Sequence, residues 1–183
     1  MKALTQAEFE SLLASTEDLR LRTMCLVAFR HGMRASEVTG LRRADVDLTA
    51  RTVVVRRLKN SLTTVQPLAE CEVEALAELL RTNIASDYVF PSNRTREKGK
   101  AGRMSRITFG RLFKSACKAA GLAEEKAHPH ALKHGLAFAL VAANVTLPLI
   151  QRALGHRSIS STAVYTMPTD EMAGAAIERA LGE

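Results

Sequence analysis

Residues 51–67 read RTVVVRRLKNSLTTVQP and decide the fold class that we predict for this chain. The β-branched run at 51–57 is typical of a strand, and a second run at 62–66 ends at Pro67, which cannot continue a central strand. The two runs predict an antiparallel hairpin with Lys59 near its turn. Because the remaining pattern is mostly helical, we predict an α+β fold, mainly α, with a small antiparallel sheet.

Helical signals flank this hairpin on both sides. Thr5 and Glu8 have the spacing of a capping box, so a first helix begins there. Gly32 is placed to end a second helix in the left-handed conformation, which leaves the residues after it on a turn. A polar bend is predicted at 45–48, and further helices at 35–41, 70–83, 105–120, 130–143, 147–154, 159–166 and 169–181. We find no repeat and no internal boundary, and expect one domain over residues 1–183.

The formal net charge of +7 over 183 residues indicates a polyanionic partner, because such a field attracts nucleic acid or anionic lipid before specific contacts form. No apolar run approaches the roughly 20 residues of a membrane span, and the N-terminus has no signal-peptide pattern. With no tryptophan and 4% aromatic residues, stacking of single-stranded bases is disfavoured. We expect a cytoplasmic, nucleoid-associated protein that binds duplex DNA and no membrane.

Cysteines and histidines offer no metal site in this sequence. Cys25, Cys71 and Cys117 are odd in number and far apart in apolar helical patterns, which favours buried, reduced thiols. The stretch HPHALKHG at 128–135 holds three histidines, two of them four residues apart on one helix face. No carboxylate or thiolate lies nearby in sequence to complete a metal shell, so we expect no metal there.

A sharper pattern is spread along the whole chain. Four separated segments each place a cationic or proton-transferring group beside a turn, and a tyrosine follows the last of them; the residues are Arg34, Lys59, His130 with Lys133, His156 and Tyr165. Such donors can cancel charge on the non-bridging oxygens of a phosphodiester while a hydroxyl attacks in line. Taken singly, each residue also has a structural interpretation, such as an Arg34–Glu37 pair or a core tyrosine.

These residues resemble the motifs of the tyrosine recombinases, the phage integrase family. The motifs of that family are a G-x-R-x-x-E box, a hairpin lysine, H-x-x-R, L-G-H and a downstream tyrosine. Here they read GMRASE at 32–37, Lys59, HALK at 130–133, LGH at 154–156 and Tyr165. The segments FRHGMRASEVTGLRRADVDL at 29–48 and RRLKNSLTTVQPL at 56–68 are similar to those of small fimbrial phase-switch DNA invertases. By this resemblance we expect a catalytic domain without the separate N-terminal DNA-clamping domain of larger integrases.

The resemblance implies a role for each matching residue. Tyr165 would attack the scissile phosphate, forming a 3′-phosphotyrosyl link and releasing a 5′-hydroxyl, with no cofactor. Arg34 would clamp the non-bridging oxygens, and Lys59 would protonate the leaving oxygen. His130 and His156 would bind the phosphate or assist proton transfer. Glu37 would orient its neighbours.

Lys133 departs from the family pattern, which has an arginine at that position. Lysine keeps the charge but loses the bidentate fork of donors that fits two phosphate oxygens. Three interpretations stay open: a working variant, a slowed enzyme, or a catalytically impaired DNA-binding regulator. A type IB topoisomerase, which shares the chemistry, is a further rival.

DNA contacts outside the pocket are predicted from the clustering of basic residues. Residues 92–103 hold five basic residues against one acid, which predicts a flexible basic loop, and the charge continues along the next helix. The predicted DNA-binding residues are Arg56, Arg57, Arg94, Arg96, Lys98, Lys100, Arg103, Arg106 and Arg111. By resemblance the working form would be a homo-tetramer on two recombination sites, helped by DNA-bending host factors. The helix at 169–181 would dock on a neighbouring subunit or on its own domain.

Overall fold

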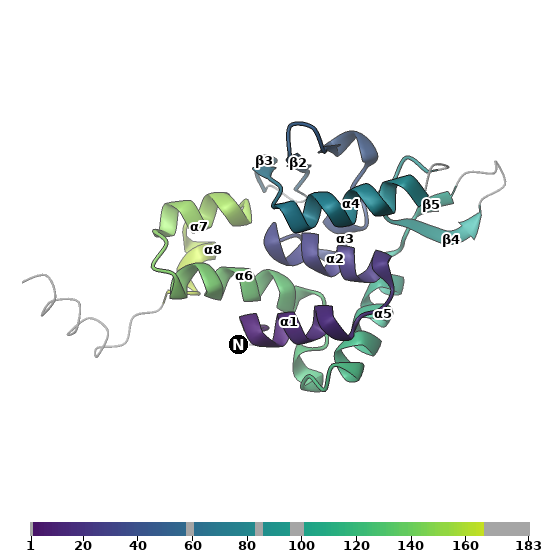
Figure 1. Cartoon of the computed structure of the whole chain (residues 1–183). Helices are drawn as coiled ribbons and strands as arrows, with labels where there is room; N and C mark the ends of the chain where they lie inside the picture. Colours follow the sequence, from purple (N-terminus) through teal and green to yellow (C-terminus); the bar gives the residue numbers. More distant parts are fainter. Residues whose placement is uncertain (1, 58–60, 83–85, 96–100, 167–183) are drawn as a thin grey trace, which may run out of the picture.

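The computed structural model describes residues 2–57, 61–82, 86–95 and 101–166 (Figure 1). The α-helices of these residues are α1 (Gln6–Ser15), α2 (Leu19–Arg30), α3 (Ala35–Val38), α4 (Glu70–Thr82), α5 (Arg106–Ala119), α6 (His130–Ala142), α7 (Leu147–Leu154) and α8 (Ser160–Ala163). Two 3-10 helices, η1 (Arg43–Asp45) and η2 (Glu124–Lys126), and five short strands complete the fold. The prediction of a mainly α protein with a small antiparallel sheet is confirmed.

Helix α2 lies at the centre of the molecule, with α4 packed on one side and α6 on the other (Figure 1). The strands β2 and β3 lie near one end of α4, and α7 and α8 lie beside α6. The helix starts follow the expected local chemistry. Thr5 and Glu8 form the capping box of α1, and such a cap contributes about 1 kcal/mol. Asp18 caps α2 through a hydrogen bond from the backbone N–H of Leu21, and Gly32 follows its end with φ 55°.

The central sheet has the order β1-β2-β3, and all of its neighbours are antiparallel. β2 (Thr52–Val55) pairs with β3 (Thr64–Pro67) in a register that sets Thr52 opposite Pro67 and Val55 opposite Thr64, which confirms the hairpin. Val53 and Val55 face the core, as the period of two requires. β1 (Val46–Asp47) adds an edge strand where we predicted a polar bend.

The basic segment after Phe90 is not entirely a loop, and the prediction for 92–103 is wrong in that respect. β4 (Pro91–Thr95) and β5 (Ala101–Arg103) pair antiparallel, with Pro91 opposite Arg103. The hairpin is anchored at its base, because the backbone N–H of Met104 donates to the carbonyl oxygen of Phe90, and both side chains are buried. The sequence prediction rested on the number of basic residues and glycines, and the segment lacks the β-branched run that is typical of a strand. The strands pair because buried Phe90 and Met104 hold the two ends of the segment together.

The core consists of two groups of buried side chains. The larger joins α1, α2, the sheet, α4, α5 and the start of α6, and includes Leu12, Val27, Leu76 and Phe109. The smaller contains Ala137, Ile150, Leu154 and Tyr165, with Phe138 packed against it. Tyr165 is therefore held by a small satellite core made by α6, α7 and the segment after α8.

The three cysteines differ in burial. Cys25 and Cys117 are buried in the core, and burial raises the pKa of both thiols, that of Cys117 to about 11. Cys71 is exposed near the start of α4, so the prediction of burial is wrong for it. Val73 and Leu76, two and five residues further along α4, lie on the opposite face of the helix and pack in or against the core. Among the described helices, none is long and apolar enough to cross a membrane.

Candidate active site

Arg34 stands on the turn between α2 and α3. Gly32 reverses the chain with φ 55°, and Arg34 takes the N-cap position of α3 in an extended conformation. The Arg34 Nη1 donates to Glu37 Oε1 at 2.8 Å, and its backbone N–H donates to Glu37 Oε2 at 2.9 Å. The side chain stays 32% exposed, so Glu37 fixes one edge of the guanidinium while the rest can face a ligand.

Arg57 binds this turn from the protein interior, and its side chain does not face solvent. Its side chain is 0% exposed, and Nη1 donates to Glu37 Oε2 at 3.0 Å and to the carbonyl oxygen of Gly32 at 2.6 Å. Nη2 donates to the carbonyl oxygens of His31 and Ala153. The prediction of Arg57 as a DNA contact is therefore wrong, because four acceptors within the protein already bind its terminal nitrogens.

Glu37 joins the two arginines as a buried carboxylate. Burial alone would raise the pKa of its carboxyl, but hydrogen bonds from Arg34 and the charges of Arg57 and Arg34 hold that pKa below its usual range. A carboxylate between two guanidinium groups stays ionised and fixes both. The expectation that Glu37 orients its neighbours agrees with this geometry.

Lys133 projects from α6 into the same buried region and is 2% exposed. Its Nζ donates to the carbonyl oxygen of Leu154, at the end of α7, at 2.9 Å. Burial, followed by the charges of Arg57 and Arg34, lowers the pKa of this ammonium to about 7. Lys133 therefore changes charge near neutral pH, which an arginine in this place would not do.

The two candidate phosphate-binding histidines lie in the electrostatic field of these cations. His156 follows Gly155, which ends α7 with φ 66°, and its Nδ1 lies 3.0 Å from the hydroxyl of Thr162. Burial and the charges of Lys133 and Arg34 lower the pKa of His156 to about 4. His130 is more exposed, but loss of hydration and the same two charges also lower its pKa. Arg34, Lys133, His130 and His156 thus belong to one site.

Tyr165 reaches this site from the segment after α8. Its residue surface is 7% exposed, and Phe138 packs edge-on against its ring with centroids 5.4 Å apart. Its Oη lies 2.8 Å from Nδ1 of His134. Burial raises the pKa of the phenol, while the charge of Arg34 opposes that rise. Sequence reasoning did not assign His134 to the site, although its spacing of four from His130 was a usable signal.

Several predicted site residues lie outside the described residues. These are Lys59, Arg96, Lys98 and Lys100, together with residues 169–181, for which we predicted a helix. Arg94 lies in β4, and its side chain is not described. In the part of the chain that the structure describes, no three His, Cys, Asp or Glu side chains gather as they would around a metal ion.

Two of the residues predicted to contact DNA line a polar cleft next to Glu37, the partner of Arg34. Arg56 and Arg103 border a cavity of about 390 Å³ together with Ser36 and Glu37 of α3. The Arg56 side chain is 66% exposed and its Nε donates to Asp45 at 2.7 Å. These two consecutive arginines therefore differ in exposure, since Arg56 faces this cleft whereas Arg57 is buried.

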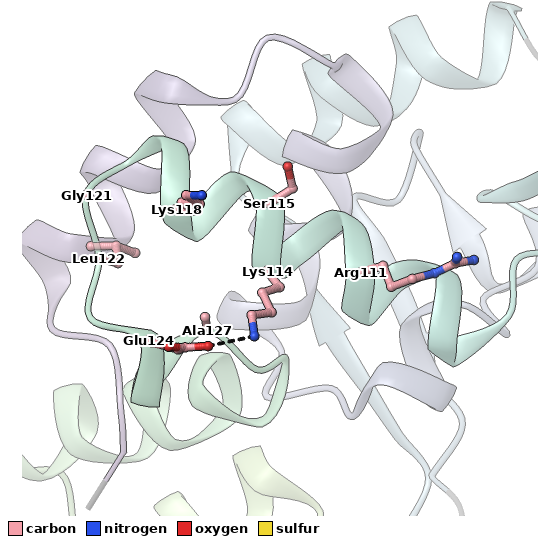
Figure 2. Close-up of a pocket in the computed structure, with 8 residues that line it drawn as sticks. All are labelled: Arg111, Lys114, Ser115, Lys118, Gly121, Leu122, Glu124 and Ala127. Atoms are coloured by element: carbon pink, nitrogen blue, oxygen red, sulfur yellow. Dashed lines mark hydrogen bonds and ion pairs between the residues drawn. The ribbon is translucent and has the colours of Figure 1, made fainter.

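A second basic groove of about 660 Å³ runs along α5 and η2. Figure 2 shows Arg111, Lys114 and Lys118 on α5 and a salt bridge from Lys114 Nζ to Glu124 Oε1, which measures 2.8 Å. Arg111 and Lys118 are exposed, as is Arg106 at the start of the helix. The helix period places Arg111, Lys114 and Lys118 on the face opposite buried Phe109 and Phe113, whereas Arg106 is exposed because it lies at the first position of the helix.

Comparison with known sequences finds one matching family model and several related proteins. A model of the phage integrase family matches residues 2–172. Type 1 fimbriae regulatory protein FimB of Escherichia coli K12 is 40% identical over 172 residues, which cover 89% of this chain and 82% of FimB. FimE of the same strain is 34% identical over 88% of this chain and 81% of FimE. Tyrosine recombinase XerD of Bradyrhizobium diazoefficiens is 33% identical over 93% of this chain and 55% of XerD.

Solved structures agree with these relatives. The crystal structure of XerA recombinase superposes with a TM-score of 0.79 at 28% identity, covering 97% of this chain and 64% of the XerA chain. XerH site-specific recombinase bound to its difH substrate, in a pre-cleavage complex, superposes with the same TM-score of 0.79 at 24% identity. That match covers 97% of this chain and 54% of the XerH chain, and at this identity it concerns the fold alone.

Proposed function

The chain belongs to the phage integrase family, and from this premise we propose that it is a site-specific DNA recombinase that cleaves and rejoins DNA through Tyr165. The observation that carries the proposal is the position of Tyr165, whose phenol lies within the field of Arg34 beside the other candidate groups. A nucleophile next to fixed cations suits attack on a phosphodiester. The fimbrial relatives favour inversion, while integration, excision and resolution use the same chemistry.

The roles that we propose are supported by the geometry of the described groups and, for Lys59, by the match to the family's hairpin lysine alone. Arg34, held by Glu37, clamps the non-bridging oxygens, and Lys133 adds a point charge from α6. His130 and His156 donate hydrogen bonds to the phosphate. Lys59, from the hairpin turn, protonates the leaving 5′-oxygen. Tyr165 Oη bonds to phosphorus as the bond to that oxygen breaks, so bond energy is conserved and no cofactor is required.

Duplex DNA is the proposed partner because exposed basic side chains continue outward from the site. Arg56 and Arg103 line the cleft beside α3, and Arg106 and Arg111 extend along α5. Such contacts to the backbone position a duplex without reading its sequence. We include Arg94, Arg96, Lys98 and Lys100 in this surface. We also propose one catalytic domain acting as a tetramer on two sites, with the helix at 169–181 docking on a neighbour and host factors bending the DNA.

One observation favours the alternative of an impaired DNA-binding regulator. The Nζ of Lys133 already donates to the Leu154 carbonyl oxygen within the protein, and a single ammonium cannot bind two phosphate oxygens as a guanidinium does. In that case the fold and the DNA surface persist while cleavage is lost.

The test is covalent trapping on nicked suicide duplexes carrying inverted repeats taken from beside the gene that encodes the chain. Trypsin releases residues 158–179, SISSTAVYTMPTDEMAGAAIER, which include Tyr165, whereas the other tyrosine, Tyr88, lies in a different peptide. We expect the 158–179 peptide to carry the nucleotide remnant in mass spectrometry. An adduct on another peptide contradicts the proposed nucleophile. Duplex binding with no adduct, restored by Lys133→Arg, supports the regulator instead.

The lowered pKa of Lys133 predicts a pH-dependent affinity for DNA. A bound phosphate favours the ammonium, so DNA binding takes up a proton between a pH of about 7 and the higher pKa that Lys133 has in the complex. Affinity should therefore fall by up to about tenfold per pH unit over that range at constant salt. His130 and His156 are already neutral there in the free protein, since their pKa values are lowered, and the Lys133→Arg variant separates any proton uptake by them from that of Lys133.

Fluorescence anisotropy with a labelled duplex between pH 6 and pH 9 measures this effect. Lys133→Arg is the matched control, because a guanidinium keeps its charge over that range and its affinity should stay level. Parallel falls for both proteins would exclude Lys133 as the titrating group.

A further inference from the structure

His134 contacts the proposed nucleophile, yet none of the roles above uses it. Its Nδ1 lies 2.8 Å from Oη of Tyr165, and the two ring centroids are 5.6 Å apart. The residues lie on α6 and after α8, so only the packing of these elements brings them together. Within the described part of the chain, this is the one side-chain hydrogen bond of the Tyr165 hydroxyl.

The surroundings hold the two groups in this position. Phe138, one turn after His134 on α6, packs edge-on against the Tyr165 ring. His130, one turn before it, packs edge-on against the His134 ring with centroids 4.7 Å apart. The imidazole is therefore fixed between aromatic neighbours, with Nδ1 directed at the hydroxyl.

Burial and, to a smaller extent, the charged groups nearby determine the protonation states of both partners. Burial, followed by the charges of His130, His128 and Lys133, lowers the pKa of His134 to about 4, so its imidazole is neutral at pH 7. Burial raises the pKa of Tyr165, with Arg34 opposing, so its phenol stays protonated. In the Nε2–H tautomer the neutral imidazole accepts at Nδ1. The hydrogen bond then runs from Oη to Nδ1, in the direction of proton transfer.

We propose that His134 is a catalytic residue that takes the proton of Tyr165 as the phenol attacks DNA, an inference that rests on the proposed recombinase function. In cleavage the Oη–H bond breaks and its proton passes to Nδ1, while the Oη–phosphorus bond forms. The bond between phosphorus and the 5′-oxygen breaks, and that oxygen takes a proton from Lys59. Rejoining reverses each transfer, and His134 returns the proton to Oη.

DNA itself makes the imidazole a better base than it is in the free protein. The scissile phosphate carries a negative charge into the site and offsets the cations that disfavour an imidazolium. The pKa of His134 therefore rises towards neutrality in the complex, where a general base is most effective.

The experiment is single-turnover cleavage of the nicked suicide duplex by wild type and His134→Asn between pH 6 and pH 10. Asparagine places an amide oxygen near the position of Nδ1, so it can hold the hydroxyl but cannot take its proton. We expect cleavage at pH 7 to fall by about 10²–10⁴-fold. The deficit should shrink by about tenfold per pH unit towards pH 10, because hydroxide then supplies the phenolate.

A second substrate separates the base from the leaving-group acid. A 5′-bridging phosphorothiolate leaves as a thiolate and needs no protonation, so it should not rescue His134→Asn. A deficit that this substrate removes, or that is constant at every pH, overturns the inference. The latter result would mean a merely structural role.

His128→Asn is the matched control, since His128 lies in the same stretch and acts on His134 through its charge alone. It should cleave within about twofold of wild type. Melting temperature and duplex affinity of each variant are measured alongside the rates. Wild type that binds DNA without forming an adduct overturns the recombinase proposal together with this one. Wild type that cleaves and His134→Asn that cleaves equally fast overturn only the role of His134.

Discussion

Tyr165→Phe is expected to lower covalent capture of DNA by at least about 10⁴-fold, because no other group can form the proposed phosphotyrosyl link. The phenylalanine ring keeps the packing of the small core around Phe138, Ile150 and Leu154. Only the hydrogen bond to His134 is lost, which costs about 1 kcal/mol of folding stability. Duplex affinity should therefore stay within about twofold of wild type.

Denaturing electrophoresis of the suicide-duplex reaction measures this loss, and Tyr88→Phe provides the matched control. Tyr88 is the other of the two tyrosines in the chain, and its ring centroid lies 5.9 Å from the guanidinium carbon of Arg42. The control removes the same atom at a distance from the proposed site and should cleave like wild type. Persistent adduct with Tyr165→Phe would rule out Tyr165 as the nucleophile.

Arg57→Leu is expected to lower the free energy of unfolding by about 3–5 kcal/mol. The substitution leaves the Glu37 carboxylate buried with one cation fewer, and it removes the donors that bind the carbonyl oxygens of Gly32, His31 and Ala153. Gly155 lies so close to this arginine that a Cβ there would come within 2.7 Å of Nε. The turn that carries Arg34 should loosen, so cleavage should fall as well.

Denaturant unfolding followed by circular dichroism measures this effect, with Arg56→Leu as the control. Arg56 also pairs with a carboxylate, but its side chain is 66% exposed, so its loss should cost about 1 kcal/mol or less. Equal losses for the two variants would contradict the anchoring role of Arg57.

The same network predicts how stability responds to acid. The folded pKa of Glu37 is lower than its unfolded value, so its contribution is complete above about pH 4.5 and is lost as pH falls through the folded value. Arg57→Leu should reduce this acid sensitivity, since the paired carboxylate then gains less from being ionised.

Local patterns determined much of this molecule. The capping box at Thr5, the stop at Gly32 and the alternation of valines in 52–55 each act through neighbouring residues, so they could be predicted. The ordered motifs from Gly32 to Tyr165 indicated the family for the same reason, because each is a short stretch with its own chemistry. The tetramer, the single-domain organisation and the roles of the site residues stay predictions.

Tertiary structure decided which charges act and which are buried. Arg56 and Arg57 follow directly after β2, and one stays exposed while the other is buried, because Arg57 is bound by acceptors from distant segments that include the carbonyl oxygen of Ala153, 96 residues further along. The pairing of Pro91 with Arg103 and the contact of His134 with Tyr165 likewise join distant segments. Burial and hydrogen bonding between such segments depend on packing, and packing is set by the whole chain. Local sequence patterns therefore predicted most of the helices, the central hairpin and the chemical groups, whereas β1, β4, β5, the partners of each group and their charge states depended on the fold.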